Sequence, residues 1–473
     1  MSQEFEKLFA QTRPAFSQDR TFQRARMLAT SALAGLGRRT VTGLLCTSAQ
    51  QFEDWSAAYR LFAKERFEHD ALFAPAKHAV IEHLATDEPL VTMMDDTIVR
   101  KRGRKVHGAA WRRDPLGPHF QTNFVWGQRF LQISAALPDT NCPGQARGIP
   151  IEFIHAPTAI KPRKTASAQD WEEYRRQQDI TKISSVGARK LHDLSSSLNN
   201  DANGRSIICA VDGGFTNRTM FRNIPEKTIL IGRIRKDAKL FCPPDTENAP
   251  RRGRPRWYGK ALPTPEQIRQ DESIPWEKVG AFAAGKQHTF EVKRLSSVRW
   301  LGSGNHTVQV IVIRPLAYRP RKGAKLLYRK PAYLICTDPA LPVDRLLQAY
   351  LWRWEIEVNF RDEKTLLGVG EAQVRNSSSV ENVPSLIVAT YALLLLAGTA
   401  AADISKLFPR PKWQQSVPPG RTTTQQLISL FRSQLWGQAL RLNLRHFAST
   451  NQTQENAFYS CNALTSAVCY AAK

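Results

Sequence analysis

The nine residues Ser206–Gly214 (SIICAVDGG) decide the fold class of this chain. Five consecutive apolar residues followed by turn formers are the pattern of a short strand buried on both faces of a sheet, and this run ends at Asp212. The run Pro89–Met94 (PLVTMM) has the same character and ends at Asp95-Asp96. Further strands are predicted at Phe124–Leu137, Gly148–Ile154 and Thr228–Ile234, and a helix at Gln169–Leu198. Strands followed by helix and strand in alternation predict a mixed α/β sheet.

A second informative stretch is Tyr350–Lys364 (YLWRWEIEVNFRDEK). On a helix with about 100° per residue, Glu357 falls in one stripe with Tyr350 and with the cations of the stretch, which are Arg353, Arg361 and Lys364. Neighbouring apolar residues such as Trp354 are expected to anchor this helix. The polar residues opposite the stripe are expected to face solvent: Gln348, Glu355, Asn359 and Asp362. The alternative is an ordinary charged helix surface with i,i+4 ion pairs, which does not explain why Glu357 lies among cations.

The candidate catalytic acids are therefore Asp95, Asp212 and Glu357. Carboxylates at the ends of buried strands, in a chain rich in positive charge, suit a hard divalent cation. For the two aspartates alone, the alternative is an Asp that ends a strand in a turn. An acid among cations is what a metal-dependent phosphodiester site needs, because the acid binds metal and the cations bind phosphates. Asp96 is the alternative to Asp95, since adjacent side chains of a strand point to opposite faces.

The composition points to a polyanionic partner. The 473 residues include 67 Lys and Arg against 42 Asp and Glu, a formal net charge of +25. This surplus favours nucleic acid over a membrane surface and argues against an enzyme for small acidic substrates. The seven cysteines are scattered and form no C-x-x-C motif, so we expect neither a zinc site nor a disulfide scaffold, and a cytoplasmic location. The apolar run Ser385–Ala402 is predicted to be a buried core helix rather than a membrane span.

The spacing Y-x2-R-x3-E-x6-K, met by Tyr350, Arg353, Glu357 and Lys364, resembles the signature of cut-and-paste insertion-sequence transposases with a DDE active site. The surrounding stretches are similar too. MDDT at 94–97 looks like the family's first-aspartate strand, AVDGG at 210–214 looks like the second, and GRRTVT at 37–42 resembles a stretch near the N-terminus of such enzymes.

This resemblance implies an RNase H-like core whose metal ligands are Asp95, Asp212 and Glu357, holding Mg²⁺ or Mn²⁺. Related polynucleotidyl transferases usually show D-x-T, which selects Asp95 because Thr97 follows it. The family's activity would be cutting double-stranded DNA at the terminal inverted repeats of the element and joining the 3′ ends to target DNA. A homodimer on paired ends is expected, with a contact around Leu427–Leu440.

The resemblance also implies a domain organisation. The long separation between Asp212 and Glu357 requires an inserted domain. We expect a helical DNA-end-binding domain at 1–87, the first part of the catalytic core at 88–235, a β-rich insertion at 236–340, the second part of the core at 341–402, and a C-terminal helical dimerisation region at 403–473. The short helices around Gly37 could be a helix-turn-helix or a plain helical bundle, and the sequence leaves both open.

Several further residues are candidates for DNA contact. Tyr350, Arg353, Arg361 and Lys364 would hold phosphates near the cut bond. The other candidates are Arg38 and Arg39 in the basic turn, Lys101, Arg102 and Arg104 in the run after the first aspartates, Arg252 and Arg254 in an R-G-R-P sequence of AT-hook type, and Trp300. A solvated loop is the alternative for the basic run. Plain backbone contact is the alternative for R-G-R-P, and a half-buried core position is the alternative for Trp300.

Three rival functions predict different behaviour. A sequence-specific DNA-binding protein without chemistry, such as a domesticated transposase, would not need the acids. A metal-dependent nuclease would share the core but would not join strands. A glycosidase would use a pair of carboxylates, which explains neither the charge nor the cationic helix.

Overall fold

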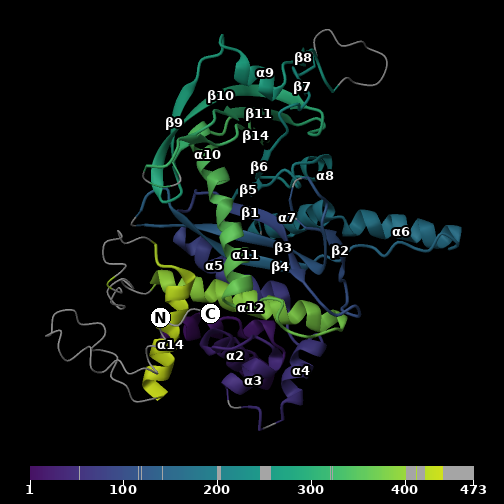
Figure 1. The fold of residues 1–473 in the computed structure, drawn as a ribbon, viewed down its shortest axis with the longest axis vertical. Helices are drawn as coiled ribbons and strands as arrows, with labels where there is room; N and C mark the ends of the chain where they lie inside the picture. The colour runs from purple at the N-terminus through teal and green to yellow at the C-terminus, as the bar shows by residue number, and fades with distance from the viewer. Residues whose placement is uncertain are drawn as a thin grey trace.

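The computed structural model describes residues 1–439 except 49, 53, 115–116, 119, 141, 200–203, 245–256, 320, 322, 401–411 and 413–420. It is a mixed α/β structure, 41% helical and 24% strand, with a large sheet flanked by helices. Figure 1 shows the central strands in the middle of an elongated molecule, with a β-rich lobe at one end and the N-terminal helices at the other. The predicted DNA contacts Arg252 and Arg254, and most of 403–473, lie outside the described residues.

Five strands form the centre of the sheet, in the order β4–β3–β1–β5–β6. Their bounds are β1 Leu90–Arg100, β3 Phe124–Pro138, β4 Ala146–His155, β5 Ile207–Val211 and β6 Thr228–Arg233. β3 is antiparallel to β1 and β4, whereas β1, β5 and β6 are parallel. Every residue of β5 is buried, as its unbroken apolar run predicts. This arrangement confirms the predicted RNase H-like fold class.

The strands that follow β6 extend the same sheet. β14 pairs with β6, and the order continues β14–β11–β10–β7–β8, with β9 on β10. The bounds are β7 Leu240–Phe241, β8 Ala261–Leu262, α9 Pro265–Gln270, β9 Glu277–Ala283, β10 Lys286–Trp300, β11 Thr307–Ile313, β12 Ala317–Tyr318, β13 Leu327–Tyr328 and β14 Ala332–Cys336. The β9–β10 hairpin was not predicted, because its strands mix polar and apolar residues and several positions remain exposed.

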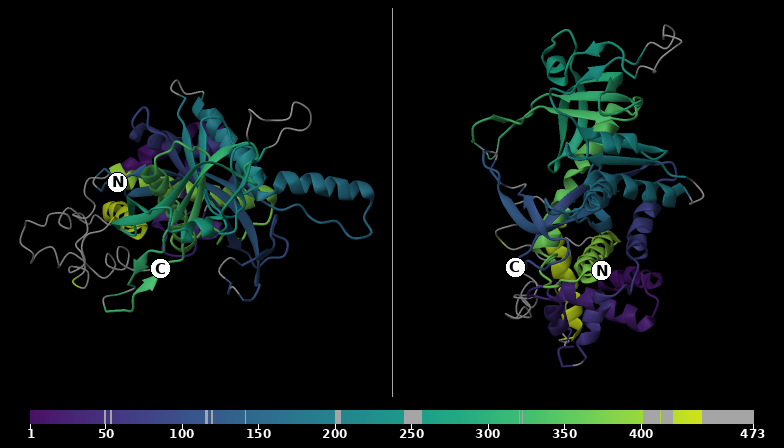
Figure 2. Two further views of the ribbon diagram at one scale, coloured as in Figure 1. Left: turned by 90° about the horizontal axis from the view of Figure 1, so that it is seen from above. Right: turned by 90° about the vertical axis from the view of Figure 1, so that its right-hand side faces the viewer.

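Different helices cover the two faces of the central strands. α10 (Val343–Trp352) and α11 (Trp354–Thr365) lie on one face, where Ile356 and Phe360 cluster with Met93. α7 (Ile183–Asn199) lies on the other face, where a Cβ on Gly187 would come within 2.8 Å of the Met94 sulfur. The alternation along β1 thus decides which of its residues point toward α11. The remaining helices of this part are α6 (Ala168–Thr181), which extends away from the body in Figures 1 and 2, and α8 (Arg218–Arg222).

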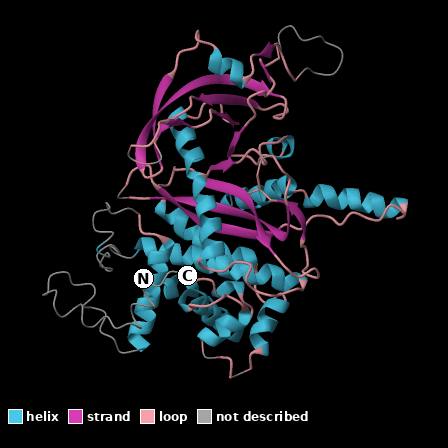
Figure 3. Ribbon diagram, viewed as in Figure 1, coloured by secondary structure: helices cyan, strands magenta, loops and turns pink. Residues whose placement is uncertain are grey.

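The N-terminal helices pack against α12 (Ser377–Ala400), which itself packs on β4, and α5 also contacts the sheet directly (Figure 3). α12 is the one described helix long and apolar enough to cross a membrane, yet it is almost wholly buried in the fold, as the core-helix prediction requires. The N-terminal elements are α1 Ser2–Ala10, η1 Arg13–Ala15, α2 Asp19–Ala34, α3 Val41–Thr47, α4 Ser56–Ala63 and α5 His69–His83. They form a helical bundle in which Thr40 caps α3.

The last described helix, α14 (Thr424–Ala439), packs on the N-terminal bundle. The ring centroids of Phe431 and Phe5 are 5.2 Å apart. The Arg432 guanidinium donates to the carbonyl oxygens of Leu33 (3.0 Å) and Gly35 (2.7 Å). The apolar side chains of its first turns, Leu427, Ile428 and Leu430, are buried. They are therefore not available for the dimer contact predicted at Leu427–Leu440.

Candidate active site

One cleft of about 1460 Å³ brings all the predicted acids together. Asp95 and Asp96 come from β1, Asp212 follows β5, and Glu357 comes from the first turns of α11. Cations from several elements line the same cleft: Arg38, Arg100, Lys101, Arg102, Arg113, Arg361, Lys364 and Arg375. The arrangement places a few carboxylates at the centre of a positively charged channel, which suits a polyanion that carries a reacting phosphate.

Strand pairing explains why Asp95 and Asp212 meet. β1 and β5 are parallel, and their last paired residues are Met94 and Val211. Each aspartate is the next residue along its strand, so both side chains lie at the same edge of the sheet. Asp212 then turns the chain, because its Oδ1 accepts from the backbone N–H groups of Gly214 (2.8 Å) and Phe215 (3.1 Å).

The alternation along β1 distinguishes Asp95 from Asp96. Asp95 shares its face with Met93, which contacts α11, and with Thr97, whose hydroxyl accepts from Lys364 Nζ at 2.5 Å. Asp96 points to the opposite face, where Arg129 and Arg112 lower its pKa, while the charge of Asp212 raises it. The geometry therefore favours Asp95 as the partner of the helix that carries Glu357.

The charges in the cleft are strongly coupled. Burial raises the pKa of Asp95 to about 8, the nearby charge of Asp212 adds to the rise, and Arg353 opposes it. Burial also raises the pKa of Asp96, against the effect of Arg129. Two carboxyls held together in a poorly solvated place favour either a proton or a cation between them.

Arg353 lies between the strand acids and Glu357. Its Nη1 donates to Asp95 Oδ2 at 3.2 Å and lies 3.8 Å from Glu357 Oε1. Within the described residues, no three Asp, Glu, His or Cys side chains lie close enough to share one ion. The donor set nevertheless fits a hard divalent cation, because all three candidate ligands are carboxylates and Arg353 supplies positive charge beside two of them.

Half of the predicted phosphate-binding cations line the cleft: Arg38, Lys101, Arg102, Arg361 and Lys364. Arg38 and Arg102 are exposed on its wall, and Lys364 and Arg361 line it from α11, although Arg361 also pairs with Asp362 at 2.9 Å. Tyr350 is half-buried beneath Arg353, whose guanidinium lies 5.9 Å from the ring centroid. Arg104 is exposed but is not among the residues that line the cleft.

Three predicted DNA contacts have structural roles, although one of them, Lys101, also lines the cleft. Arg39 is 1% exposed, and its guanidinium donates to the carbonyl oxygens of Ala32 and Gly37, so DNA cannot reach it. Lys101 donates to the carbonyl oxygens of Gly370 (2.9 Å) and Ala372 (3.4 Å), and burial lowers its pKa to about 8. The remaining one is Trp300, whose half-buried ring packs edge-on against Phe221 at 5.1 Å. The core alternative weighed for this tryptophan is the correct one.

The predicted orientation of α11 is partly wrong. Asn359 and Asp362 are buried, Glu355 forms an ion pair with Arg421, and Trp354 is 65% exposed. The polar side chains are tolerated inside because they have partners: Asn359 donates to Gly148 O and accepts from Ser134, and Asp362 accepts from Thr424 (2.6 Å). The chain also bends out of one helix at Arg353, between α10 and α11. A single helical wheel therefore could not give the correct buried face.

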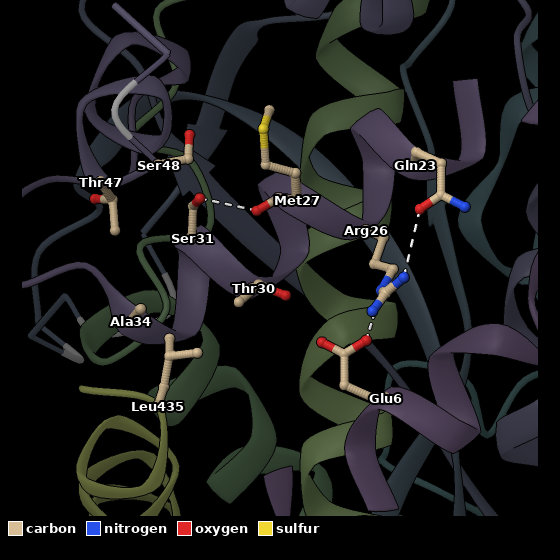
Figure 4. A pocket seen from close by; sticks show the side chains of 10 residues that line it. All are labelled: Glu6, Gln23, Arg26, Met27, Thr30, Ser31, Ala34, Thr47, Ser48 and Leu435. Carbon is tan, nitrogen blue, oxygen red and sulfur yellow. Dashed lines mark hydrogen bonds and ion pairs between the residues drawn. The ribbon is translucent and has the colours of Figure 1, made fainter. Parts of the chain in front are cut away.

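Sequence reasoning missed other residues of the cleft. Arg113 and Val125 come from a β-hairpin, and the loop from Val369 to Arg375 forms part of the wall. No motif marks this loop, so only the fold reveals it. A second hollow, of about 380 Å³, lies between α1, α2, α3 and α14 (Figure 4). Its charged residues, Glu6 and Arg26, already pair with each other at 2.5 Å, and it contains none of the candidate acids.

The fold and the cleft define an enzyme of the RNase H-like class that acts on nucleic acid. The chain belongs to the DDE superfamily endonuclease family, whose model matches residues 11–303. Such enzymes have nuclease or transposase activity on DNA and typically use divalent metal ions. The match includes Asp95 and Asp212 and ends before α11, so the assignment of Glu357 depends on its position in the cleft. Comparison with curated proteins gives no match.

Proposed function

We propose that the protein is a DNA transposase that cuts at the terminal inverted repeats of its element and joins the 3′ ends to target DNA. The observation that supports this most directly is the meeting of Asp95, Asp212 and Glu357, from three separate elements, in one cleft lined by cations. The proposal places the enzyme in the bacterial cytoplasm, where it would act as a homodimer on two paired DNA ends.

In this proposal Asp95, Asp212 and Glu357 would hold Mg²⁺ or Mn²⁺. The metal ions, when bound, would activate a water or a 3′-hydroxyl and stabilise the leaving oxygen. Lys364 and Arg353 would hold the phosphates beside the cut bond, and Arg353 would leave Asp95 when the metal site fills. Arg38 and Arg102 on the cleft wall would bind phosphates farther along the strand.

The test uses DNA that spans both flanks of the protein's own gene, incubated with Mg²⁺ and either the wild type, Glu357→Gln or Glu172→Gln. Glu172 is an exposed residue of α6 and serves as the matched control. We expect discrete cuts at inverted repeats with the wild type and the control, and none with Glu357→Gln. Equal cutting by Glu357→Gln would refute the site assignment.

A second assay separates a transposase from a plain nuclease. DNA ends that already carry a free 3′-hydroxyl are mixed with supercoiled plasmid, and joined products are counted. Cutting without joining would establish the nuclease alternative. Binding to the flanks without cutting, in Mg²⁺ and in Mn²⁺, would establish the non-catalytic DNA-binding protein.

A further inference from the structure

A short two-stranded ribbon at the edge of the cleft carries exposed aromatic side chains. It consists of β2 (Ala110–Arg113) and the first four residues of β3, which we call the aromatic ribbon. Trp111 pairs with Trp126, and Arg113 pairs with Phe124. Because directly paired residues share a face, these four side chains lie on one side of the ribbon.

This aromatic face lacks cover from the rest of the described chain. Trp111 is 68% exposed and Phe124 is 61% exposed. Trp111 makes an edge contact with the partly buried Trp126, with ring centroids 5.6 Å apart, and Trp111 remains exposed. Exposed aromatic groups that adjoin a site are characteristic of contact surfaces, because leaving them in water costs free energy.

The ribbon is held firmly against the end of β1. Trp126 Nε1 donates to Gly103 O at 3.0 Å, and the Lys101 backbone N–H donates to Trp126 O at 2.9 Å. Arg100 pairs with Asp114 at 2.9 Å across the base of the loop. These contacts tie the ribbon to β1, the strand that carries Asp95.

The ribbon also adjoins the charged wall of the cleft. Arg113, which shares the aromatic face with Phe124, lines the same cleft as Asp95 and Glu357, and Val125 lines it from the opposite face of the ribbon. Trp111 and Phe124 thus lie beside the cleft, at its edge. Arg100 and Arg102 lie beside it on the same wall. A partner that fits must therefore combine negative charge with flat apolar faces. A DNA strand has both, but its base faces are accessible only where base pairs have opened.

We propose that Trp111 and Phe124 stack on unpaired bases of the DNA strand that passes through the cleft. The arginines beside them would bind the phosphates of the same nucleotides. This inference rests on the proposed function, since it uses the same DNA path, and it adds that the substrate is opened near the site. It also gives a function to the aromatic face of the ribbon, which has no role in the proposed chemistry of Asp95, Asp212 and Glu357.

The experiment compares two fluorescein-labelled duplexes in Ca²⁺, one fully paired and one with a mismatched bubble that contains 2-aminopurine. We expect the wild type to prefer the bubble and to quench its 2-aminopurine. Trp111→Ala and Phe124→Ala should each reduce the affinity for the bubble by about 5- to 100-fold, the range for losing one stacked base, and leave paired DNA unaffected. Trp111→Phe should retain the preference. Phe52→Ala, which removes an aromatic group that is 86% exposed outside the cleft, should change nothing.

Each other outcome would overturn the inference. If both alanine variants keep the preference for the bubble, the ribbon does not bind bases, although the enzyme could still cut DNA. If the alanine variants instead change the molar mass of the protein in analytical ultracentrifugation, the aromatic face is a contact between protein chains. A wild type that binds neither duplex would refute the proposed function itself, and the cutting assay distinguishes that case.

Discussion

At the scale of single residues, the candidate site depends on which side chain of two adjacent residues points toward the cleft or toward α11. Asp95 and Asp96 are adjacent residues of β1. Arg38 and Arg39 are adjacent residues of the turn before α3. In each pair the first residue faces α11 or the open cleft, whereas the second lies beside other groups: Asp96 beside Arg129 and Arg112, although it also lines the cleft, and Arg39 against backbone carbonyl oxygens. Such pairs offer matched variants of identical chemistry.

Asp95→Asn should reduce DNA cleavage by on the order of 10³-fold or more, because it removes one of three carboxylates of the site. Asp96→Asn should cost less than about tenfold, because its carboxyl lies with Arg112 and Arg129 on the opposite face. The measurement is the first-order cleavage rate in Mg²⁺ and in Mn²⁺. A larger loss for Asp96→Asn would mean that the first acid has been misassigned.

Arg38→Gln should reduce the slope of log affinity against log salt by about one, because an exposed arginine on the cleft wall that binds a phosphate displaces one counterion. Arg39→Gln should leave that slope unchanged and lower the free energy of unfolding by about 2–4 kcal/mol, because its guanidinium is buried against carbonyl groups. Salt titrations of DNA binding and urea unfolding test both. If Arg39→Gln changes the salt dependence and Arg38→Gln lowers the stability, the assignment of Arg38 to phosphate binding is wrong.

Metal affinity should depend on pH through Asp95. Its pKa of about 8 means that the carboxyl holds a proton at neutral pH, and a metal must displace that proton. The affinity for Mn²⁺ should therefore rise with pH, by at most about tenfold per unit, and level off above about pH 8. Calorimetry in two buffers of different ionisation enthalpy would detect the released proton. Affinity independent of pH from about 6 to 9 would contradict this expectation.

At the scale of elements, α11 is positioned by what lies behind it. Glu355 forms an ion pair with Arg421 at 2.8 Å, and Asp362 accepts from Thr424 at the start of α14. Arg421 also donates to Ala146 O at 2.6 Å, which ties the same segment to β4. The C-terminal segment thus supports the face of α11 opposite Glu357.

Arg421→Ala should lower the free energy of unfolding by about 1–3 kcal/mol, because it leaves Glu355 largely buried without its partner. It should also slow cleavage, since α11 loses support behind Glu357. The double variant Glu355→Gln/Arg421→Gln should cost less than the two single variants together. Strict additivity in urea unfolding would show that the pair does not act as a unit.

Sequence reasoning predicted the parts of this site that follow from strand periodicity and short spacing. The buried runs before Asp95 and Asp212 identified two strands of the central sheet, and the cationic stripe pointed to Glu357, which the structure places in the same cleft. It could not predict the buried face of α11, because Asn359 and Asp362 are buried only by virtue of partners far away in the chain. The prediction that Arg39 contacts DNA was wrong for the same reason, because local sequence does not show which of two adjacent arginines is buried.

At the scale of the whole molecule, one sheet connects the acids to the β-rich lobe. β6 is paired on one side with β5 and on the other with β14, so the strands after residue 240 continue the catalytic sheet. The pairing of β14 with β6 joins residues far apart in sequence, which local patterns cannot reveal. The sequence predicted β structure in this region, but not its continuity with the core.

The contact between α14 and both α11 and the N-terminal bundle has a consequence for synthesis. A ribosome makes all three acids before it makes Arg421, so a growing chain carries the complete set while α11, the helix that bears Glu357, still lacks its support. If translation stops after α12, the protein lacks Arg421, the ion-pair partner of Glu355, and Phe431, whose ring packs against Phe5. A nascent chain therefore gains the contacts behind α11 and over Phe5 only when the segment from Arg421 to Phe431 has been made.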